Sequence, residues 1–201
     1  ALELLSAYGF GVAVDTKSDL VSRDADVLAE IAAQMPALVK FSITTADPDL
    51  AARLEPGAPS PERRFAAMEQ LAKAGVFTGL LLMPVLPGLT DNRENLSRLL
   101  RQTAEAGGRF CYCWPGLTMR EGQREYFYQA LDREFPGLRE KYEKRYGTRY
   151  RCTVPGAAKL YAWVREECSR LGLLSEMEAI IAVSRRGYDF GGLPGQASLF
   201  S

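Results

Sequence analysis

The stretch LVKFSITTADPDLAARLEPGAPSPERRFAAMEQLAKAGVFTGLLLMPV, residues 38–85, predicts a strand, a helix and a second strand in succession. Its two ends, residues 38–45 and 76–85, are runs that are apolar on both alternating faces, which is typical of buried parallel strands. Between them, Ser60 followed by Pro61 is the usual signature of a helix start. The stretch therefore predicts a β–α–β unit with parallel strands.

The same alternation continues on both sides of this stretch. Two further β-rich runs lie at residues 10–15 and 109–114. Asp91 with Glu94 resembles a capping box at the start of the helix that precedes the last run. Right-handed crossovers would place all four strands parallel in one sheet or barrel wall, so the predicted fold class is α/β. Apolar residues at helical spacing lie between the runs, at Val27, Leu28, Ile31 and Met35, at Phe65, Met68, Leu71 and Ala72, and at Leu96, Leu99, Leu100 and Ala104.

The alternation stops after Gly116. Residues 117–186 contain a series of helical patterns, and the glycine-rich residues 187–201 predict an irregular tail. We therefore expect a strand–helix part over residues 1–116, a helical extension over residues 117–186 and the tail.

Composition excludes several classes of function. The chain has no histidine, which removes Ser-His and Cys-His nucleophiles and His-ligated metal sites. Basic and acidic residues balance at 25 each, so global charge gives no argument for nucleic acid or an anionic membrane. No apolar run reaches the ~20 residues of a membrane helix, and no signal peptide is recognisable. We expect a cytoplasmic protein without a membrane partner.

The four cysteines match no C-x-x-C pattern, and we expect reduced thiols. An auxiliary iron–sulfur cluster on all four is one interpretation, since thiolates are the usual ligands. Buried structural cysteines are the commoner explanation. The four are Cys111, Cys113, Cys152 and Cys168.

Polar residues stand where the predicted strands end. Lys17 follows the first strand and could pair with a carboxylate or phosphate, or could be a solvated lysine in a turn. Ser42 lies inside an apolar strand, so its hydroxyl bonds either backbone or a ligand. Glu55 and Arg64 flank a loop with three prolines, and helix capping explains only the second half of that loop. This loop is a candidate rim of a binding site.

The segment 139–151 has six basic and two acidic residues, with Tyr142, Tyr146 and Tyr150 spaced four apart. Aromatic rings beside cations could bind nucleic acid. A tyrosine stripe on an amphipathic helix more often serves packing.

Taken together, DTKSDLVSRDADVLAEI (15–31), residues 39–75 and LLLMPVLPGLTDN (80–92) resemble the spore photoproduct lyase-like family of radical S-adenosylmethionine (SAM) proteins. The resemblance implies a partial (β/α) barrel that, in the intact protein, holds SAM and a [4Fe-4S] cluster. The family's C-x-x-x-C-x-x-C cluster loop has no match here, and we expect it, with the first barrel strands, upstream of Ala1. No catalytic residue and no metal ligand is therefore assigned to this chain.

The resemblance also implies roles for individual residues. Lys17 and Ser42 match family positions that contact SAM, and Met83 with Pro84 matches backbone near its adenine. Glu55 and Arg64 match a signature that we interpret as shaping the barrel mouth.

The implied function is that of a portion of a radical SAM enzyme, which forms a 5′-deoxyadenosyl radical for hydrogen abstraction. Lyase-like action on DNA is one form this could take, and the chain given should be inert. The alternatives are a non-catalytic module binding a small anion through Lys17, or a nucleic-acid interaction domain. Without a preceding strand, residues 10–14 would form an unpaired apolar edge, so we expect an oligomeric or marginally stable chain.

Overall fold

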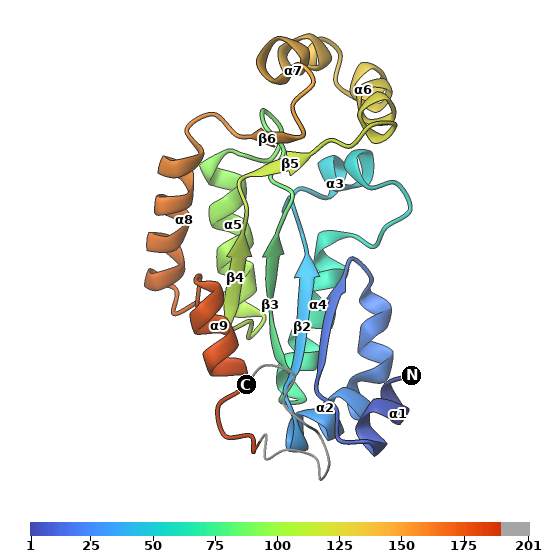
Figure 1. The fold of residues 1–201 in the computed structure, drawn as a ribbon, viewed down its shortest axis with the longest axis vertical. Coiled ribbons are helices and arrows are strands. Elements are labelled where there is room, and N and C mark those ends of the chain that lie inside the picture. The colour runs from blue at the N-terminus through green and yellow to red at the C-terminus, as the bar shows by residue number, and fades with distance from the viewer. Residues whose placement is uncertain (190–201) are drawn as a thin grey trace, which may run out of the picture.

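The computed structural model describes residues 1–189, and its centre is a four-stranded sheet in the order β1–β2–β3–β4 (Figure 1). All three strand pairs are parallel. Strand order follows chain order, as in a barrel wall, whereas a doubly wound sheet reverses its order at a switch point. The α/β prediction is confirmed, and the sheet is a barrel wall. The strands are Val12–Thr16, Ala37–Ser42, Phe77–Leu82 and Phe110–Cys113.

One face of the sheet is covered by helices α2 (Ala25–Gln34), α4 (Pro61–Lys73) and α5 (Arg93–Glu105). Their apolar stripes form one core with alternate strand residues, such as Phe41 and Leu80. Residues one position along each strand point to the opposite face. That face carries side chains of mixed polarity: Asp15, Lys40, Ser42, Leu81 and Tyr112.

The ends of the helices follow local capping rules, with one correction. Ser60 caps α4, as the sequence predicts, by accepting a hydrogen bond from the Arg63 N–H. The predicted capping box at Asp91 is wrong, because Asn92 is the residue that caps α5. The Asp91 carboxylate instead accepts from the Gly88 N–H at 2.9 Å. It therefore shapes the preceding loop.

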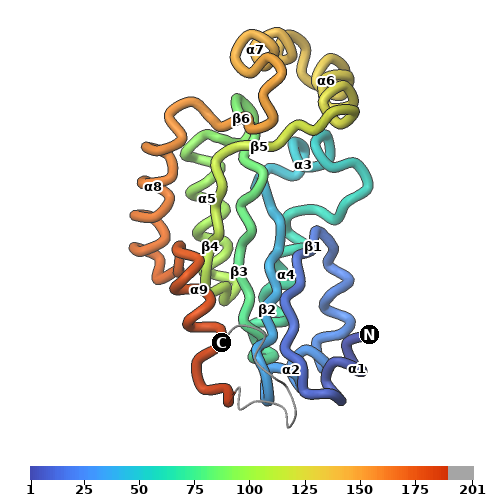
Figure 2. The backbone as a smooth tube through the Cα atoms, viewed as in Figure 1, coloured from blue at the N-terminus to red at the C-terminus, as the bar shows by residue number. Residues whose placement is uncertain are grey.

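Strand β1 lies at the edge of the sheet, where β2 is its partner among residues 1–189 (Figure 2). The flanking elements at this edge are α1 (Leu2–Ala7), which contacts α2, and the 3₁₀ helix η1 (Asp19–Asp24). The loop after β2 contains one more short helix, α3 (Pro48–Leu54). Large apolar side chains near this edge are exposed: Leu4, Tyr8, Phe10 and Leu20.

The C-terminal part contains the expected helices and an unexpected small sheet. This sheet has two antiparallel strands, β5 (Gly116–Thr118) and β6 (Arg151–Thr153). Helices α6 (Gln123–Glu134) and α7 (Leu138–Tyr146), which lie between the two strands in the chain, form a second small core with it. Helix α8 (Ala157–Arg170) packs on α5 and β4, and α9 (Met177–Ser184) follows it. Residues 117–186 are thus not purely helical.

None of the helices within residues 1–189 is both long and apolar enough to span a membrane. Most of the predicted irregular tail, residues 190–201, lies outside the described residues.

Candidate functional site

A cavity of about 710 Å³ opens where the carboxyl ends of the four parallel strands meet. Ligands of parallel α/β folds gather at this end, because the loops that follow the strands converge there. We call it the mouth cavity. Its lining consists of Lys17, Thr44, Leu54, Glu55, Met83, Pro84, Leu86, Tyr112, Trp114, Leu117, Thr118, Phe127, Tyr150 and Arg151.

Behind one wall of the cavity, Arg64 is the centre of a buried polar network. Its side chain is 2% exposed, and its three nitrogens each donate a hydrogen bond. Nε donates to the Pro59 carbonyl at 2.9 Å and Nη1 to the Ser42 carbonyl at 2.7 Å. Nη2 donates to the Glu55 carboxylate at 2.6 Å, and the other oxygen of Glu55 pairs with Lys17 Nζ at 2.6 Å. The network thus joins the ends of β1 and β2 to the loop before α4.

The network contains two cations, Lys17 and Arg64, and one carboxylate, Glu55. Burial by itself would raise the pKa of Glu55, but hydrogen bonds and charge from Lys17 and Arg64 outweigh it, so its pKa lies below the usual value. Glu55 is therefore a carboxylate at neutral pH. Its 15% exposure contrasts with 51% for the Lys17 side chain. The ion pair with Glu55 therefore holds the Lys17 ammonium in place, and the remaining N–H donors of that ammonium are available to a ligand in the cavity.

The proline-rich loop has a structural reason for its stiffness. It must leave α3, place Glu55 over Arg64 and then start α4 within six residues. Gly57 turns the chain with φ of 81°, a conformation that side chains other than glycine rarely adopt. Pro61 occupies the first turn of α4, where its missing N–H is not needed. The loop thereby surrounds the Arg64 guanidinium, which donates hydrogen bonds to Pro59 and Glu55 of the loop.

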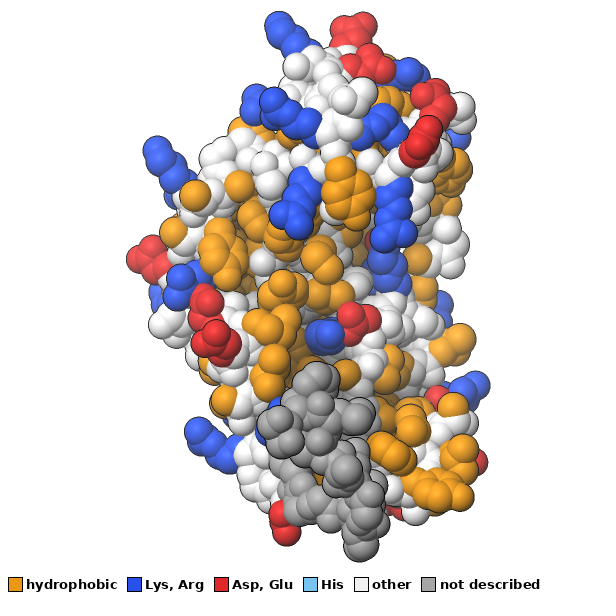
Figure 3. Space-filling view, in the orientation of Figure 1, with side chains coloured by type: hydrophobic (Ala, Val, Ile, Leu, Met, Phe, Trp, Pro, Cys, Tyr) orange, Lys and Arg blue, Asp and Glu red, His pale blue; other side chains and the backbone are white. Residues whose placement is uncertain are grey.

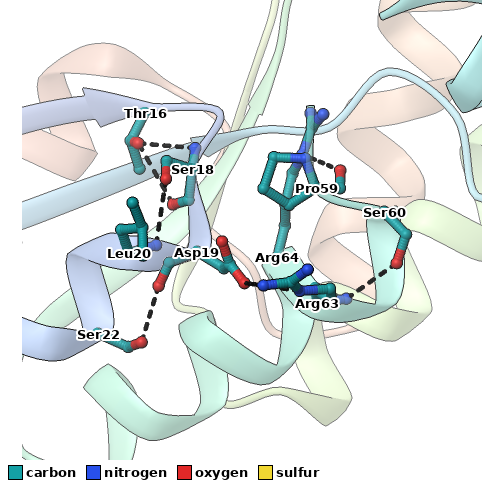
Figure 4. A network of polar contacts seen from close by, with 9 residues as sticks. All are labelled: Thr16, Ser18, Asp19, Leu20, Ser22, Pro59, Ser60, Arg63 and Arg64. Atoms are coloured by element: carbon teal, nitrogen blue, oxygen red, sulfur yellow. Dashed lines mark hydrogen bonds and ion pairs between the residues drawn. The ribbon is translucent and has the colours of Figure 1, made fainter. Parts of the chain in front are cut away.

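The neighbouring Arg63 makes a separate, exposed contact (Figure 4). Its guanidinium pairs with Asp19 of η1 at 2.6 Å, and its side chain is 67% exposed. Figure 4 shows Arg64 reaching Pro59 while Arg63 points to Asp19, so two consecutive arginines serve different elements. The turn after β1 is closed by Ser18, whose N–H donates to Thr16 Oγ1 at 2.9 Å.

The opposite wall is the loop that follows β3. Met83 is 36% exposed, and both Met83 and Pro84 line the cavity, joined by a cis peptide bond. The Val85 N–H donates to the Gly116 carbonyl at 3.1 Å, which attaches this loop to the start of β5. The loop is therefore fixed on both sides of the cavity-lining residues.

Sequence reasoning missed the aromatic and cationic part of the lining. Tyr112 and Trp114 alternate with the two cysteines of β4, and both line the cavity. Their alternation was the available signal. The C-terminal part contributes three further lining residues, Phe127, Tyr150 and Arg151. No short-range sequence pattern could have placed these residues at the mouth cavity.

Sequence reasoning also missed Asn95, which ties two strand-end loops together. Its Nδ2 donates to the Thr44 and Thr90 carbonyls, both at 3.0 Å, and its Oδ1 accepts from the Ala46 N–H at 2.9 Å. Asn95 is a buried amide with three partners inside the core. It keeps the loops after β2 and β3 at a constant distance.

The predicted site residues fall into two groups. Ser42 and Arg64 lie behind the wall rather than in it, and Ser42 is buried. The others line the mouth cavity itself: Lys17, Glu55, Met83 and Pro84.

The cysteines lie away from the mouth cavity. Cys111, Cys113 and Cys168 belong to the core between the sheet and the helices, while Cys152 lies in the second core. The hydrogen bond between the Cys111 and Cys168 thiols, together with burial, raises the pKa of Cys111, and burial raises the pKa of Cys113 to about 12. Within residues 1–189, no three Cys, Asp or Glu side chains are grouped as metal ligands. The geometry thus gives the auxiliary-cluster interpretation no support.

The tyrosine stripe serves packing at two of its three positions. Tyr142 and Tyr146 are buried, 2% and 5% exposed, and their rings contact each other at 5.5 Å. Tyr150 is 48% exposed and lines the mouth cavity. The rings of Tyr142 and Tyr146 are therefore unavailable for stacking on bases.

These features define a (β/α)-barrel-type protein with a ligand cavity at the carboxyl ends of its strands. Comparison with known proteins agrees. Residues 1–100 match the family model of the Radical SAM superfamily. The chain belongs to the radical SAM superfamily.

Relatives and a solved structure extend this result. Uncharacterized proteins of Mycobacterium tuberculosis and Mycobacterium bovis are 37% identical over 142 residues, which is 71% of this chain and 42% of each relative. The chain thus spans less than half the length of the curated relatives it matches. A spore photoproduct lyase double mutant, with bound S-adenosylmethionine and dinucleoside spore photoproduct, superposes with a TM-score of 0.59 at 17% identity. That match covers 87% of this chain and 53% of the other, and it shows the shared fold.

Proposed function

We propose that the mouth cavity binds SAM and that the complete protein is a radical SAM enzyme. The observation that carries this proposal is the convergence of Lys17 and Met83–Pro84, from the ends of β1 and β3, on one cavity. In this superfamily, SAM bound beside a [4Fe-4S] cluster supplies a 5′-deoxyadenosyl radical that abstracts hydrogen from a substrate. The residues of this chain bind and orient the ligand and exclude water from it.

The lining suits the chemical groups of SAM. Lys17 offers a cation to the ligand's carboxylate, and Glu55 and Arg64 hold that cation in place. Tyr112, Trp114 and the Met83–Pro84 segment offer apolar surface to a purine. We propose Ser42 as a further contact from the resemblance alone, since it is buried and is not among the residues that line the cavity. The cavity volume lies within the usual range for small-ligand sites.

The cysteines of this chain do not fit the cluster, because none of them lies at the mouth cavity. We therefore propose that the cluster ligands belong to a part of the complete protein other than these 201 residues. The chain alone should bind SAM without cleaving it.

Isothermal titration calorimetry of the 201-residue chain with SAM tests the binding site. Lys17→Met should weaken binding by at least tenfold, because it removes a charge-assisted hydrogen bond worth about 1.5–3 kcal/mol. Lys73→Met is the matched control, since Lys73 is an exposed lysine on α4 paired with Glu69. Equal affinity for SAM in both variants, or no SAM binding by the wild type, would refute the proposal that the mouth cavity binds SAM.

For the substrate of the complete protein we propose a nucleic-acid photoproduct. The support is the fold shared with spore photoproduct lyase, which was solved with a dinucleoside photoproduct. Incubation of the reduced full-length protein with SAM and that dinucleoside, followed by chromatography, tests it. Formation of 5′-deoxyadenosine without repaired dinucleoside would keep the radical chemistry and reject this substrate.

We further propose that additional barrel strands of the complete protein cover the free edge of β1 and the exposed Leu4, Tyr8 and Phe10 beside it. The isolated chain should then self-associate through this edge. Light scattering coupled to size exclusion measures the mass. A stable monomer with a high melting temperature would contradict the proposal.

A further inference from the structure

The net charge of the chain is zero, but two parts of the chain carry net charges of opposite sign. Residues 117–156, which hold α6, α7, β6 and most of β5, contain nine Lys and Arg against six Asp and Glu, a net charge of +3. The rest of the chain has sixteen against nineteen, a net charge of −3. Figure 3 shows Lys and Arg side chains over this end of the molecule, with several Asp and Glu side chains among them. Residues 117–156 therefore carry a net positive charge on an otherwise acidic protein.

A second cavity, of about 550 Å³, lies in this cationic part and is separate from the mouth cavity. We call it the α7 cavity. Its apolar base is formed by Pro87, Leu138 and Pro155, which come from three different segments. Charged residues in its lining are all basic: Lys141, Lys144 and Arg145.

These three cations are exposed, and none forms an ion pair with a carboxylate in the described part of the chain. Arg139 on the same helix differs, because its guanidinium contacts Glu125, Asp132 and Glu143. Three carboxylates near α7 are thus engaged by Arg139. The cavity lining itself carries three cations and no carboxylate, and Asp91 on the neighbouring loop is a nearby opposing charge.

The base of the cavity is held in place before any ligand arrives. Tyr142 donates a hydrogen bond to the Pro87 carbonyl at 2.8 Å, and Tyr146 donates to the Thr153 carbonyl at 2.7 Å. These bonds fix α7 against the loop after β3 and against β6. A ligand here would lose little free energy to ordering the protein, because the apolar base is already formed.

We propose that the α7 cavity binds a small phosphorylated molecule such as a nucleotide. Two ammonium groups and one guanidinium would meet its phosphate oxygens, for which Arg and Lys are the usual partners. The two prolines and the leucine would contact its ring. Asp91, which accepts from the Gly88 N–H beside the cavity, is the opposing charge on the loop side. The site is independent of SAM binding at the mouth cavity.

Calorimetry at 50 mM and 200 mM salt tests this with ADP, adenosine, inorganic pyrophosphate and the oligonucleotide dT12 as probes. ADP and pyrophosphate should bind, and adenosine should bind at least tenfold more weakly than ADP. Raising the salt concentration from 50 mM to 200 mM should lower the affinity for ADP. The variant K141A/K144A/R145A should lose at least tenfold in ADP affinity. The control K73A/R101A/K159A removes the same charge from exposed positions elsewhere and should retain it.

Three outcomes would overturn the proposal. The first is equal ADP affinity in the two triple variants, with both variants melting like the wild type. The second is binding of dT12 without binding of ADP, which would assign the cations to a nucleic-acid strand. The third concerns Lys17→Met, which should leave ADP affinity unchanged: loss of ADP binding in this variant would place the nucleotide in the mouth cavity and refute the α7 site.

Discussion

Replacement of Arg64 by methionine should destabilise the protein far more than the same change at Arg63. Methionine has a similar length but no hydrogen-bond donor, so two carbonyls lose their partner and the Glu55 carboxylate loses a buried cation. Breaking a buried ion pair by removing one partner costs about 3–5 kcal/mol. Arg63 is 67% exposed, and the loss of such a surface pair costs below about 1 kcal/mol.

Urea unfolding followed by circular dichroism at pH 7 measures this difference. With a denaturant slope of about 3 kcal/mol per molar, the Arg64→Met midpoint should fall by roughly 1–1.7 M. Arg63→Met should fall by less than about 0.3 M on the same slope. Both variants lose one positive charge from adjacent positions of α4, so net charge and helix propensity are matched. Midpoints within 0.3 M of each other would refute the role assigned to the buried network.

The same network predicts a pH dependence. The pKa of Glu55 is lowered in the folded state, so its stabilisation is complete above the ordinary value of 4.5 and is lost as pH falls through the folded pKa. The wild type should therefore lose stability relative to Glu55→Gln as the pH drops below about 4.5. Parallel stability curves for the two proteins between pH 3 and 6 would show that Glu55 is not stabilised by its cations.

Three further predictions concern the core. Asn95→Ala should lower the free energy of unfolding by roughly 1–3 kcal/mol, because it leaves buried backbone groups unsatisfied; a loss within 0.5 kcal/mol, measured in urea, would contradict this. Gly79→Ala should cost roughly 1–3 kcal/mol, since the added Cβ would lie 2.5 Å from the Phe110 carbonyl oxygen, and an unchanged melting temperature would show that the strands can separate without penalty. The four thiols, including the fully buried Cys111 and Cys168, should not react with Ellman's reagent in the native protein at pH 8 and should all react in urea; one rapidly reacting native thiol would be inconsistent with their burial.

Local patterns were sufficient to predict the sheet. The apolar runs that became β2 and β3 are buried over most of their length, and the start of α4 at Ser60 and Pro61 follows from capping chemistry alone. The small sheet of β5 and β6 could not be predicted in the same way. Its two strands have three residues each and lie more than thirty residues apart, so neither shows a period.

The candidate site shows the same division. Lys17 could be placed at the mouth because it directly follows a strand. The burial of Arg64 could not be predicted, since arginine is ordinarily exposed and one of its acceptors, the Ser42 carbonyl, lies on a strand end 22 residues earlier. The role of Asn95 could not be predicted either, because its hydrogen-bond partners lie on two loops that only the folded sheet brings together.

The agreement between strand order and chain order has a consequence for how the protein is made. Each strand pairs with its neighbour in the sequence, at separations of 25 residues for Val12 and Ala37 and 31 residues for Gly79 and Phe110. A strand emerging from the ribosome therefore finds the edge it needs already synthesised, with its crossover helix complete. The sheet can grow one strand at a time during translation, and at each step the newest strand is the exposed edge that the next β–α unit will cover.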